Sequence, residues 1–263
     1  MFKETDFNSV GRMDAISLDE MSSVSLMNRI DTKFVTTVQV LEHVLDDALY
    51  EGYRICEISG RRLMPYSSVY YDTDDLKMFT AHRNGKKTRQ KVRVRTYLSD
   101  NESFLEIKRK NNRGRTKKKR IAIDESYFAR VSESAEAAAF LRERANFAPE
   151  IISPALITKF DRITLVNHAH TERLTIDMNL RFVNMRAAEP CEAKIDRMVI
   201  VELKQDGLCY SPMKEILLDL RVKTLKVSKY CVGTALSNPT VKANRFKRKI
   251  RLIHKTIAEQ SQF

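Results

Sequence analysis

The sequence Lys-Val-Arg-Val-Arg at residues 91–95 constrains the fold more than any other stretch, because cationic and apolar side chains alternate in it without exception. Successive side chains of a β-strand point to opposite faces, so Lys91, Arg93 and Arg95 share one face and the two valines share the other. Three like charges in a row repel each other unless water or an anion lies among them. The stretch therefore predicts a strand with one apolar face and one cationic face.

The same alternation recurs in at least five further predicted strands. Their charged faces carry Arg29, Asp31 and Lys33; Glu106, Lys108 and Lys110; Arg162; Arg173, Thr175 and Asp177; and Glu202 and Lys204. Two arrangements fit this pattern: an ordinary sheet whose charged side faces water, or a closed or nearly closed antiparallel barrel with helices outside and a wet, cationic lumen. The charged faces are short of Ser, Thr, Asn and Gln, which fits the barrel better, but periodicity alone leaves both open.

The remaining elements follow from propensity and helical spacing. A capping box at Ser17 and Glu20 predicts a short helix, and Asp72 with Thr73 predicts the cap of another that begins at 74–75. Strands are predicted at 28–36, 66–73, 88–97, 103–110, 117–123, 155–165, 171–178 and 197–205, and helices at 37–49, 125–145, 212–221 and 228–237. With no repeat and no obvious linker, one α+β domain is the simplest interpretation.

Composition restricts the functional class. The chain of 263 residues has a formal net charge of +13, which favours an anionic partner such as nucleic acid, a membrane surface or a phosphorylated small molecule. No glycine-rich phosphate loop occurs, and the four cysteines lack the spacing of a zinc site or a disulfide framework. Without an apolar leader or a run of 18 apolar residues, we expect a soluble cytoplasmic protein with no transmembrane segment.

Nine segments, in order, resemble the VTC domain, the polyphosphate-polymerase domain of vacuolar transporter chaperone proteins in the triphosphate tunnel metalloenzyme superfamily. They are RIDTKF (29–34), VYYDTDDLKMF (69–79), KVRVRTY (91–97), FLEIKRK (104–110), RTKKKR (115–120), KFDR (159–162), RLTIDMNL (173–180), VIVELK (199–204) and SKY (228–230). The resemblance implies an antiparallel β-barrel tunnel with a cationic lumen and helices outside. It assigns 25–238 to that domain, after a lead-in at 1–24 with a short helix and before a basic C-terminal tail or helix at 239–263.

The resemblance also implies an activity: transfer of the γ-phosphoryl group of ATP to phosphate or polyphosphate, with Mn²⁺ or Mg²⁺ as cofactor. The residues that it implies for catalysis are Lys33, Arg93, Arg95, Lys108, Arg162 and Arg173. Those expected to bind substrate are Arg29, Lys91, Lys119, Lys204 and Lys229, where the run Lys117–Lys119 leaves the register at Lys119 open. Glu202 is the expected metal ligand, with Glu106 as a helper.

One departure separates this chain from hydrolytic members of the superfamily, which begin with E-x-E-x-K. Here Arg29 occupies the first acidic position and Asp31 the second, which favours the polymerase branch. A triphosphatase and a non-catalytic protein that binds polyphosphate or nucleic acid are the alternatives. Nucleic acid is the weaker of these partners, because no aromatic residue for base stacking interrupts 91–95 or 113–120.

Two basic runs and one histidine pair are the remaining candidates for binding or metal sites. The run 108–120 holds nine Lys or Arg residues and no acid, and predicts either a solvated hairpin or cations at a tunnel mouth. The basic run at 241–255 is either a solvated tail or a contact with polyphosphate, nucleic acid, an acidic partner or a membrane. His168 and His170 have no nearby carboxylate or cysteine, so they favour a loop over a metal site.

Overall fold

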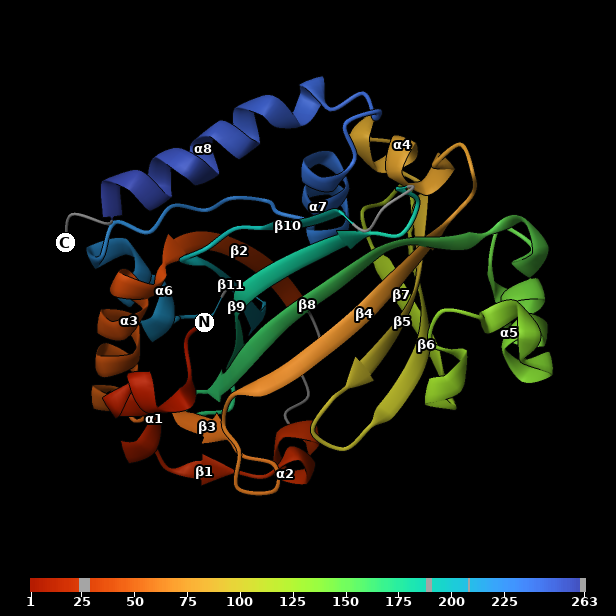
Figure 1. Cartoon of the computed structure of the whole chain (residues 1–263). Helices are drawn as coiled ribbons and strands as arrows, with labels where there is room; N and C mark the ends of the chain where they lie inside the picture. Colours follow the sequence, from red (N-terminus) through yellow and green to blue (C-terminus); the bar gives the residue numbers. More distant parts are fainter. Residues whose placement is uncertain (24–28, 188–190, 208, 261–263) are drawn as a thin grey trace.

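One large antiparallel sheet dominates the protein (Figure 1). The structure, a computed structural model, describes residues 1–23, 29–187, 191–207 and 209–260. The strands are β1 (Ala15–Ile16), β2 (Arg29–Thr37), β3 (Arg54–Cys56), β4 (Met64–Asp72), β5 (Arg89–Tyr97), β6 (Glu102–Lys110), β7 (Thr116–Ile123), β8 (Ser153–Val166), β9 (Glu172–Asn184), β10 (Cys191–Lys194) and β11 (Met198–Asp206). The α-helices are α1 (Asn8–Arg12), α2 (Leu18–Ser23), α3 (Val38–Tyr50), α4 (Lys77–Arg83), α5 (Ala135–Arg144), α6 (Pro212–Asp219), α7 (Lys229–Ser237) and α8 (Asn244–Gln260).

The main path of the sheet has two ends. Its strand order is β2-β11-β9-β8-β4-β5-β6-β7, with β3 and β10 paired beside β8 and β9, and β1 pairs with β3 in parallel. In the part of the chain that the structure describes, no pairing joins β2 to β7. The closed form of the predicted barrel is therefore wrong, while the large antiparallel sheet with helices around it is confirmed.

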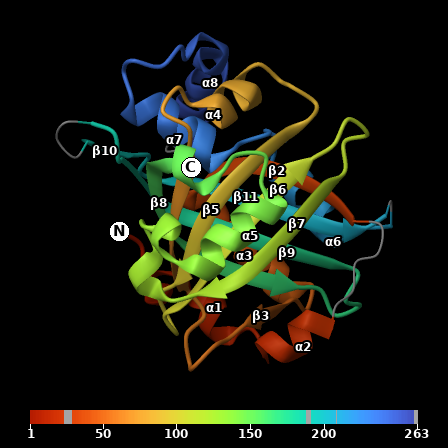
Figure 2. The same ribbon diagram turned by 90° about the vertical axis from the view of Figure 1, so that its right-hand side faces the viewer.

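The apolar sides of the strands are covered by helices, as the alternation predicts. Helices α3 and α6 pack their buried leucines and valines over β8, β9 and β11 at one end of the sheet, and α5 covers β4, β5 and β6 at the other (Figures 1 and 2). In β5, Val92 and Val94 are fully buried in the apolar cluster between α5 and the sheet, which we call the outer cluster. The opposite side of the sheet carries the charged residues together with a separate apolar cluster under α7 and α8, which includes Tyr66, Tyr70 and Ile200.

Both terminal segments are more ordered than the sequence predicts. Phe7, Val10 and Met13 of the lead-in are buried in the main core, and α2 begins with the predicted capping box between Ser17 and Glu20. The basic tail is the helix α8, anchored by its apolar face. The predicted domain boundary at residues 24 and 25 lies outside the described residues. No helix that the structure describes is long and apolar enough to cross a membrane.

Two local predictions can also be compared with the structure. The carboxylate of Asp72 accepts hydrogen bonds from the backbone nitrogens of Met78 and Phe79, each 2.8 Å long, so this residue caps α4 as predicted, although the helix begins at Lys77. The predicted helix over 125–145 is instead two short 3₁₀ turns, Glu125–Tyr127 and Val131–Glu133, followed by α5. All four cysteines are free thiols.

Candidate functional site: a cationic cavity on the inner face of the sheet

A cavity of about 1260 Å³ lies against the charged face of the sheet, and all eight strands of the main path contribute to its wall. Of the described residues that line it, seventeen are Lys or Arg and six are Asp or Glu, which leaves an excess of eleven positive charges. The whole chain carries a formal charge of +13, so most of that excess is concentrated here. Such a wall is suited to a highly charged anion.

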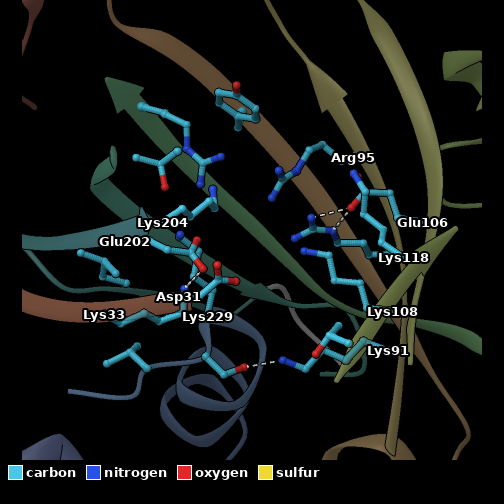
Figure 3. A pocket seen from close by; sticks show the side chains of 18 of the residues that line it. Asp31, Lys33, Lys91, Arg95, Glu106, Lys108, Lys118, Glu202, Lys204 and Lys229 are labelled. Carbon is cyan, nitrogen blue, oxygen red and sulfur yellow. Dashed lines mark hydrogen bonds and ion pairs between the residues drawn. The ribbon is translucent and has the colours of Figure 1, made fainter. Parts of the chain in front are cut away.

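The sheet curves around this cavity although its edges do not pair. In a flat sheet the five strand steps from β11 to β6 would separate Glu202 from Lys108 by roughly 24 Å. Instead, the charge of Glu202 acts on Lys108 and favours its protonated form, against Arg93 and burial, which lower its pKa. The two side chains face the same space in Figure 3. The segment 224–229 crosses the concave side: the nitrogen of Leu225 donates to the carbonyl of Lys33 in β2, and Lys91 Nζ in β5 donates to Ser228 Oγ at 2.9 Å.

The first ionic group in the wall joins the edge strand β2 to β11. Lys33 and Glu202 are direct cross-strand neighbours, and their charged atoms lie 2.5 Å apart. Burial alone would raise the pKa of Glu202, but Lys204 and Lys33 lower it far below its usual range. Glu202 is therefore an ionised carboxylate whose side chain is 20% exposed to the cavity.

The second group lies on β5, β6 and β7. Arg93 donates to Oε2 of Glu106 from both Nε and Nη2, at 2.7 and 2.5 Å, and its Nη1 donates to the hydroxyl of Tyr70 at 3.1 Å. Lys118 Nζ donates to the other oxygen of Glu106 at 3.1 Å. The Glu106 side chain is only 2% exposed, so its two cations hold it as a fixed internal counter-ion.

The third group connects β8 and β9 to the start of α7. Arg162 donates to the two oxygens of Asp177 at 2.6 and 2.9 Å, and Lys229 donates to the same carboxylate. Burial would raise the pKa of Asp177, but these two cations lower it well below its usual range. Lys229 also lies 4.2 Å above the ring of Phe160, so the first residue of α7 is fixed by an ion pair and an aromatic face.

Three cavity cations, Arg95, Lys108 and Lys204, form no ion pair with the carboxylates that the structure describes. Burial and the neighbouring Arg93 and Arg162 lower the pKa of Arg95, while Arg93 and burial lower that of Lys108. Burial also lowers the pKa of Lys204 to about 8. Each of these charges is held in the folded protein at an electrostatic cost that a bound anion would relieve.

Most of the predicted site residues line this one cavity. Those that do are Lys33, Lys91, Arg93, Arg95, Glu106, Lys108, Arg162, Arg173, Glu202, Lys204 and Lys229. Arg29 begins β2, but its side chain lies outside the described residues. Lys119 does not line the cavity: it is paired with Ile107, which belongs to the outer apolar face, and Lys118 and Arg120 face inward instead.

The two isoleucines at the end of β7 contain the signal that determines which of its cations face the cavity. Ile121 and Ile123 both pack on the outer cluster, and period two then assigns Lys119 to the outside and Arg120 to the inside. The alternation in β9 assigns Asp177 to a charged face but does not predict that it anchors two cations. Arg245 and Lys249, in the basic tail, also line the cavity, and no spacing in the sequence relates them to the strands.

The acidic residues allow a limited test of fit for a divalent metal. Among the residues described, no group of three His, Cys, Asp or Glu side chains could hold a metal by itself. Both oxygens of Glu106 are engaged by cations, which does not suit a ligand. Glu202 fits, because its carboxylate is ionised and open to the cavity, and Mg²⁺ is commonly held by one or two protein carboxylates together with phosphate oxygens and water.

Comparison with solved structures places this geometry among known folds. The chain is similar to a candidate adenylyl cyclase from Hippeastrum with a dominant triphosphatase activity, at a TM-score of 0.50 and 12% identity over 79% of this chain and 95% of that chain. It is also similar to a candidate adenylate cyclase from Vibrio parahaemolyticus, at a TM-score of 0.46 and 9% identity over 79% of this chain and 99% of that chain. At 12% identity the likeness to the Hippeastrum protein shows the fold alone.

Comparison by sequence is more specific. A search of curated proteins finds no match. The model of the VTC domain matches residues 28–238, which include all eight strands of the main path and every predicted site residue. The match covers far more than half of the chain, and it contains the ordered segments from which the resemblance was inferred. The protein belongs to the VTC domain family.

Proposed function

We propose that the protein transfers the γ-phosphoryl group of ATP to phosphate or polyphosphate in this cavity, with Mn²⁺ or Mg²⁺ as cofactor. The observation that carries the proposal is the set of cations without ion pairs, buried Arg95 and half-buried Lys108 and Lys204, in a wall with an excess of eleven positive charges. Several fixed cations are what a triphosphate needs to replace its hydration and to hold it in one orientation.

The cations of the cavity have two different roles in the proposed phosphoryl transfer. Glu106 fixes Arg93 and Asp177 fixes Arg162, so these guanidinium groups are held in place before the substrate binds. Fixed donors of this kind stabilise charge on phosphate oxygens without reorganising during the reaction. Arg95, Lys108 and Lys204 are free to accept the remaining phosphate charge.

Glu202 would hold the metal, and Lys33 would then release its carboxylate partner and become available to the substrate. The chemistry that a metal would supply there is Lewis-acid neutralisation of part of the phosphate charge. Because phosphoryl transfer needs little covalent help from protein, these positioning and electrostatic roles are sufficient for the reaction.

Hydrolysis is the second candidate, in which water replaces phosphate as the acceptor. The triphosphatase activity of the Hippeastrum protein, which shares the fold, favours it. The sequence of β2 favours transfer instead, because Arg29 stands where hydrolytic members of the superfamily have a first carboxylate. A protein that binds polyphosphate or nucleic acid without catalysis is the third candidate.

Product analysis separates these candidates. Purified protein with ATP and Mn²⁺ should give a polyphosphate ladder on gels, and Arg95→Ala should abolish most of it. Lys119→Ala removes a cation from the outer face of the same sheet and serves as the matched control that keeps activity. Phosphate release from tripolyphosphate without polymer would establish hydrolysis, and neither product would leave a binding protein.

A further inference from the structure

The cavity is much longer than a triphosphate. Five successive inward-facing residues of β5, Arg89, Lys91, Arg93, Arg95 and Tyr97, all line it. At the rise of an antiparallel strand, the eight steps from Arg89 to Tyr97 cover roughly 27 Å. A triphosphate held at Arg93 and Arg95 would therefore leave the cavity open on both sides.

The two ends of the cavity differ in charge. At the end next to α2, the lining mixes the acidic residues Asp19, Asp100 and Glu102 with the basic residues Arg62 and Arg120. At the other end lie α4 and α8, which Figures 1 and 2 both show on the side of the sheet opposite to α2. An anionic chain that extends from the middle of the cavity is therefore attracted less strongly to the mixed end than to an end lined by cations alone.

The end next to α4 and α8 is cationic. We call Arg83, Arg89, Arg245 and Lys249 the α4/α8 mouth; all four line the cavity, and no described carboxylate lines it between them. Two contacts hold the mouth together: Arg83 donates to the carbonyl of Lys242 at 3.2 Å, and the rings of Phe79 in α4 and Phe246 in α8 lie 5.8 Å apart.

Helix α8 contributes half of the mouth from outside the family domain, because the VTC match ends at residue 238. Arg245 and Lys249 are one helical turn apart, so they project from the same side of the helix. Buried Phe246 and Ile253 anchor that side against the core, while Lys247 and Arg251 are exposed and do not line the cavity. Packing thus fixes the helix from which exposed Arg245 and half-buried Lys249 reach the cavity.

We infer that the α4/α8 mouth is a second anion subsite, which binds the part of a linear polyphosphate that extends beyond the three phosphoryl groups held at Arg93 and Arg95. The inference rests on the proposed function and adds the direction in which the chain leaves the cavity. A polyphosphate suits the mouth better than a nucleic acid, because Phe246, the only Phe, Tyr or Trp that lines it in the described chain, is 7% exposed and packed on Phe79. The half-buried ring of His82 in α4 is then the one ring left there for base stacking, whereas proteins that bind single strands stack successive bases on several rings.

A pair of double variants tests the subsite. R245Q/K249Q removes two mouth cations, and K247Q/R251Q removes one Lys and one Arg at the same spacing from the exposed side of the same helix. Binding of tripolyphosphate and of a long-chain polyphosphate is measured by titration calorimetry at several salt concentrations. For R245Q/K249Q, long-chain affinity should fall about tenfold and the slope of log K against log salt should lose roughly 1 to 2 units. Tripolyphosphate affinity should stay within about twofold.

Each outcome has a defined meaning. Equal losses in the two double variants would overturn the subsite in favour of general charge attraction, and an equal loss for tripolyphosphate would place Arg245 and Lys249 in the central site. If single-stranded RNA competes as well as polyphosphate at equal phosphate concentration, the mouth is a nucleic-acid site. Wild-type protein that binds neither polyphosphate would overturn the proposed function itself, whereas equal per-molecule affinity for both would overturn only the subsite. Thermal unfolding of both variants verifies that they fold.

Discussion

The ammonium nitrogen of Lys33 lies 2.5 Å from Oε1 of Glu202, its direct neighbour across the pair of strands β2 and β11. This carboxylate is ionised, partly open to the cavity and surrounded by an excess of cations. Glu202→Gln keeps the shape of the side chain but removes a metal ligand and one negative charge. Polymer formation should fall steeply, while binding of tripolyphosphate without metal should hold or tighten because the cavity becomes more positive.

Titration calorimetry of Glu202→Gln with tripolyphosphate, with and without Mn²⁺, measures both effects. The expected result is a loss of the metal-dependent part of the affinity alone. Weaker binding in the absence of metal would mean that Glu202 is a structural partner of Lys33 and Lys204, and the assignment as a metal ligand would be wrong.

Arg93 and Arg95 point the same way along β5 but differ in their partners. Arg95 has no ion pair in the described structure, and its nearest hydrogen-bond partner is Ser68 Oγ at 3.4 Å. Arg95→Ala should therefore weaken tripolyphosphate binding by about 1.5–3 kcal/mol with little effect on stability. Arg93→Ala should lower stability as well, because it leaves the buried Glu106 with Lys118 as its remaining ionic partner.

Calorimetry and chemical denaturation of the two arginine variants separate binding from stability. Lys119→Ala, on the outer face, is the control that should change neither. If Arg93→Ala unfolds at the same denaturant concentration as the wild type, the claim that the ion pair with Glu106 holds Arg93 in place is wrong.

Lys204 and Lys229 predict a pH dependence of binding. Burial lowers the pKa of each to about 8, so in the free protein both ammonium groups lose their protons as the pH rises through that value. A bound polyanion favours the protonated form and raises the pKa. Affinity should therefore be highest below pH 8 and fall above it, and binding between about pH 8 and 10 should take up protons.

Proton uptake is measured by titration in two buffers with different ionisation enthalpies. Lys204→Arg should reduce the uptake, because a guanidinium group stays charged throughout this range. An affinity that is constant from pH 7 to about pH 10 would contradict the contribution of these two lysines.

Gly233 allows α7 to pack closely on the sheet. A Cβ atom at this position would lie 2.8 Å from Cδ2 of Leu156 and closer still to the ring of Phe182. Gly233→Ala should destabilise the protein by about 1–3 kcal/mol through overpacking. Gly11→Ala in α1 is the matched control, since nothing lies within 4 Å of its Cβ, and it should be neutral or stabilising by up to about 1 kcal/mol. Thermal or chemical unfolding compares the two, and equal stability would disprove the close approach.

The strands and their inward faces could be predicted because each strand carries apolar residues at period two, as Val92 and Val94 do in β5. The register failed only where this signal is diluted: Lys117, Lys118 and Lys119 give β7 cations on both faces, and only Ile121 and Ile123 distinguish them. Period two assigns faces but says nothing about how strand edges meet, so the open path from β2 to β7 could not be predicted.

Long-range contacts were the other part that the sequence could not supply. The helical spacing of α8 predicts an amphipathic helix, but the cavity that Arg245 and Lys249 reach depends on where Phe246 packs against Phe79. The sequence likewise gives no partner for Asp177, because Arg162 and Lys229 come from β8 and α7 and meet only in the folded protein.

The most direct test of the central claim is the fate of the γ-phosphoryl group. ATP labelled at the γ position is incubated with the protein, Mn²⁺ and a short polyphosphate, and ADP, free phosphate and label in polymer are measured together. Transfer in the cavity predicts that ADP exceeds free phosphate and that polymer-bound label accounts for the difference, which Arg95→Ala removes. Free phosphate equal to ADP, with no label in polymer, would contradict it.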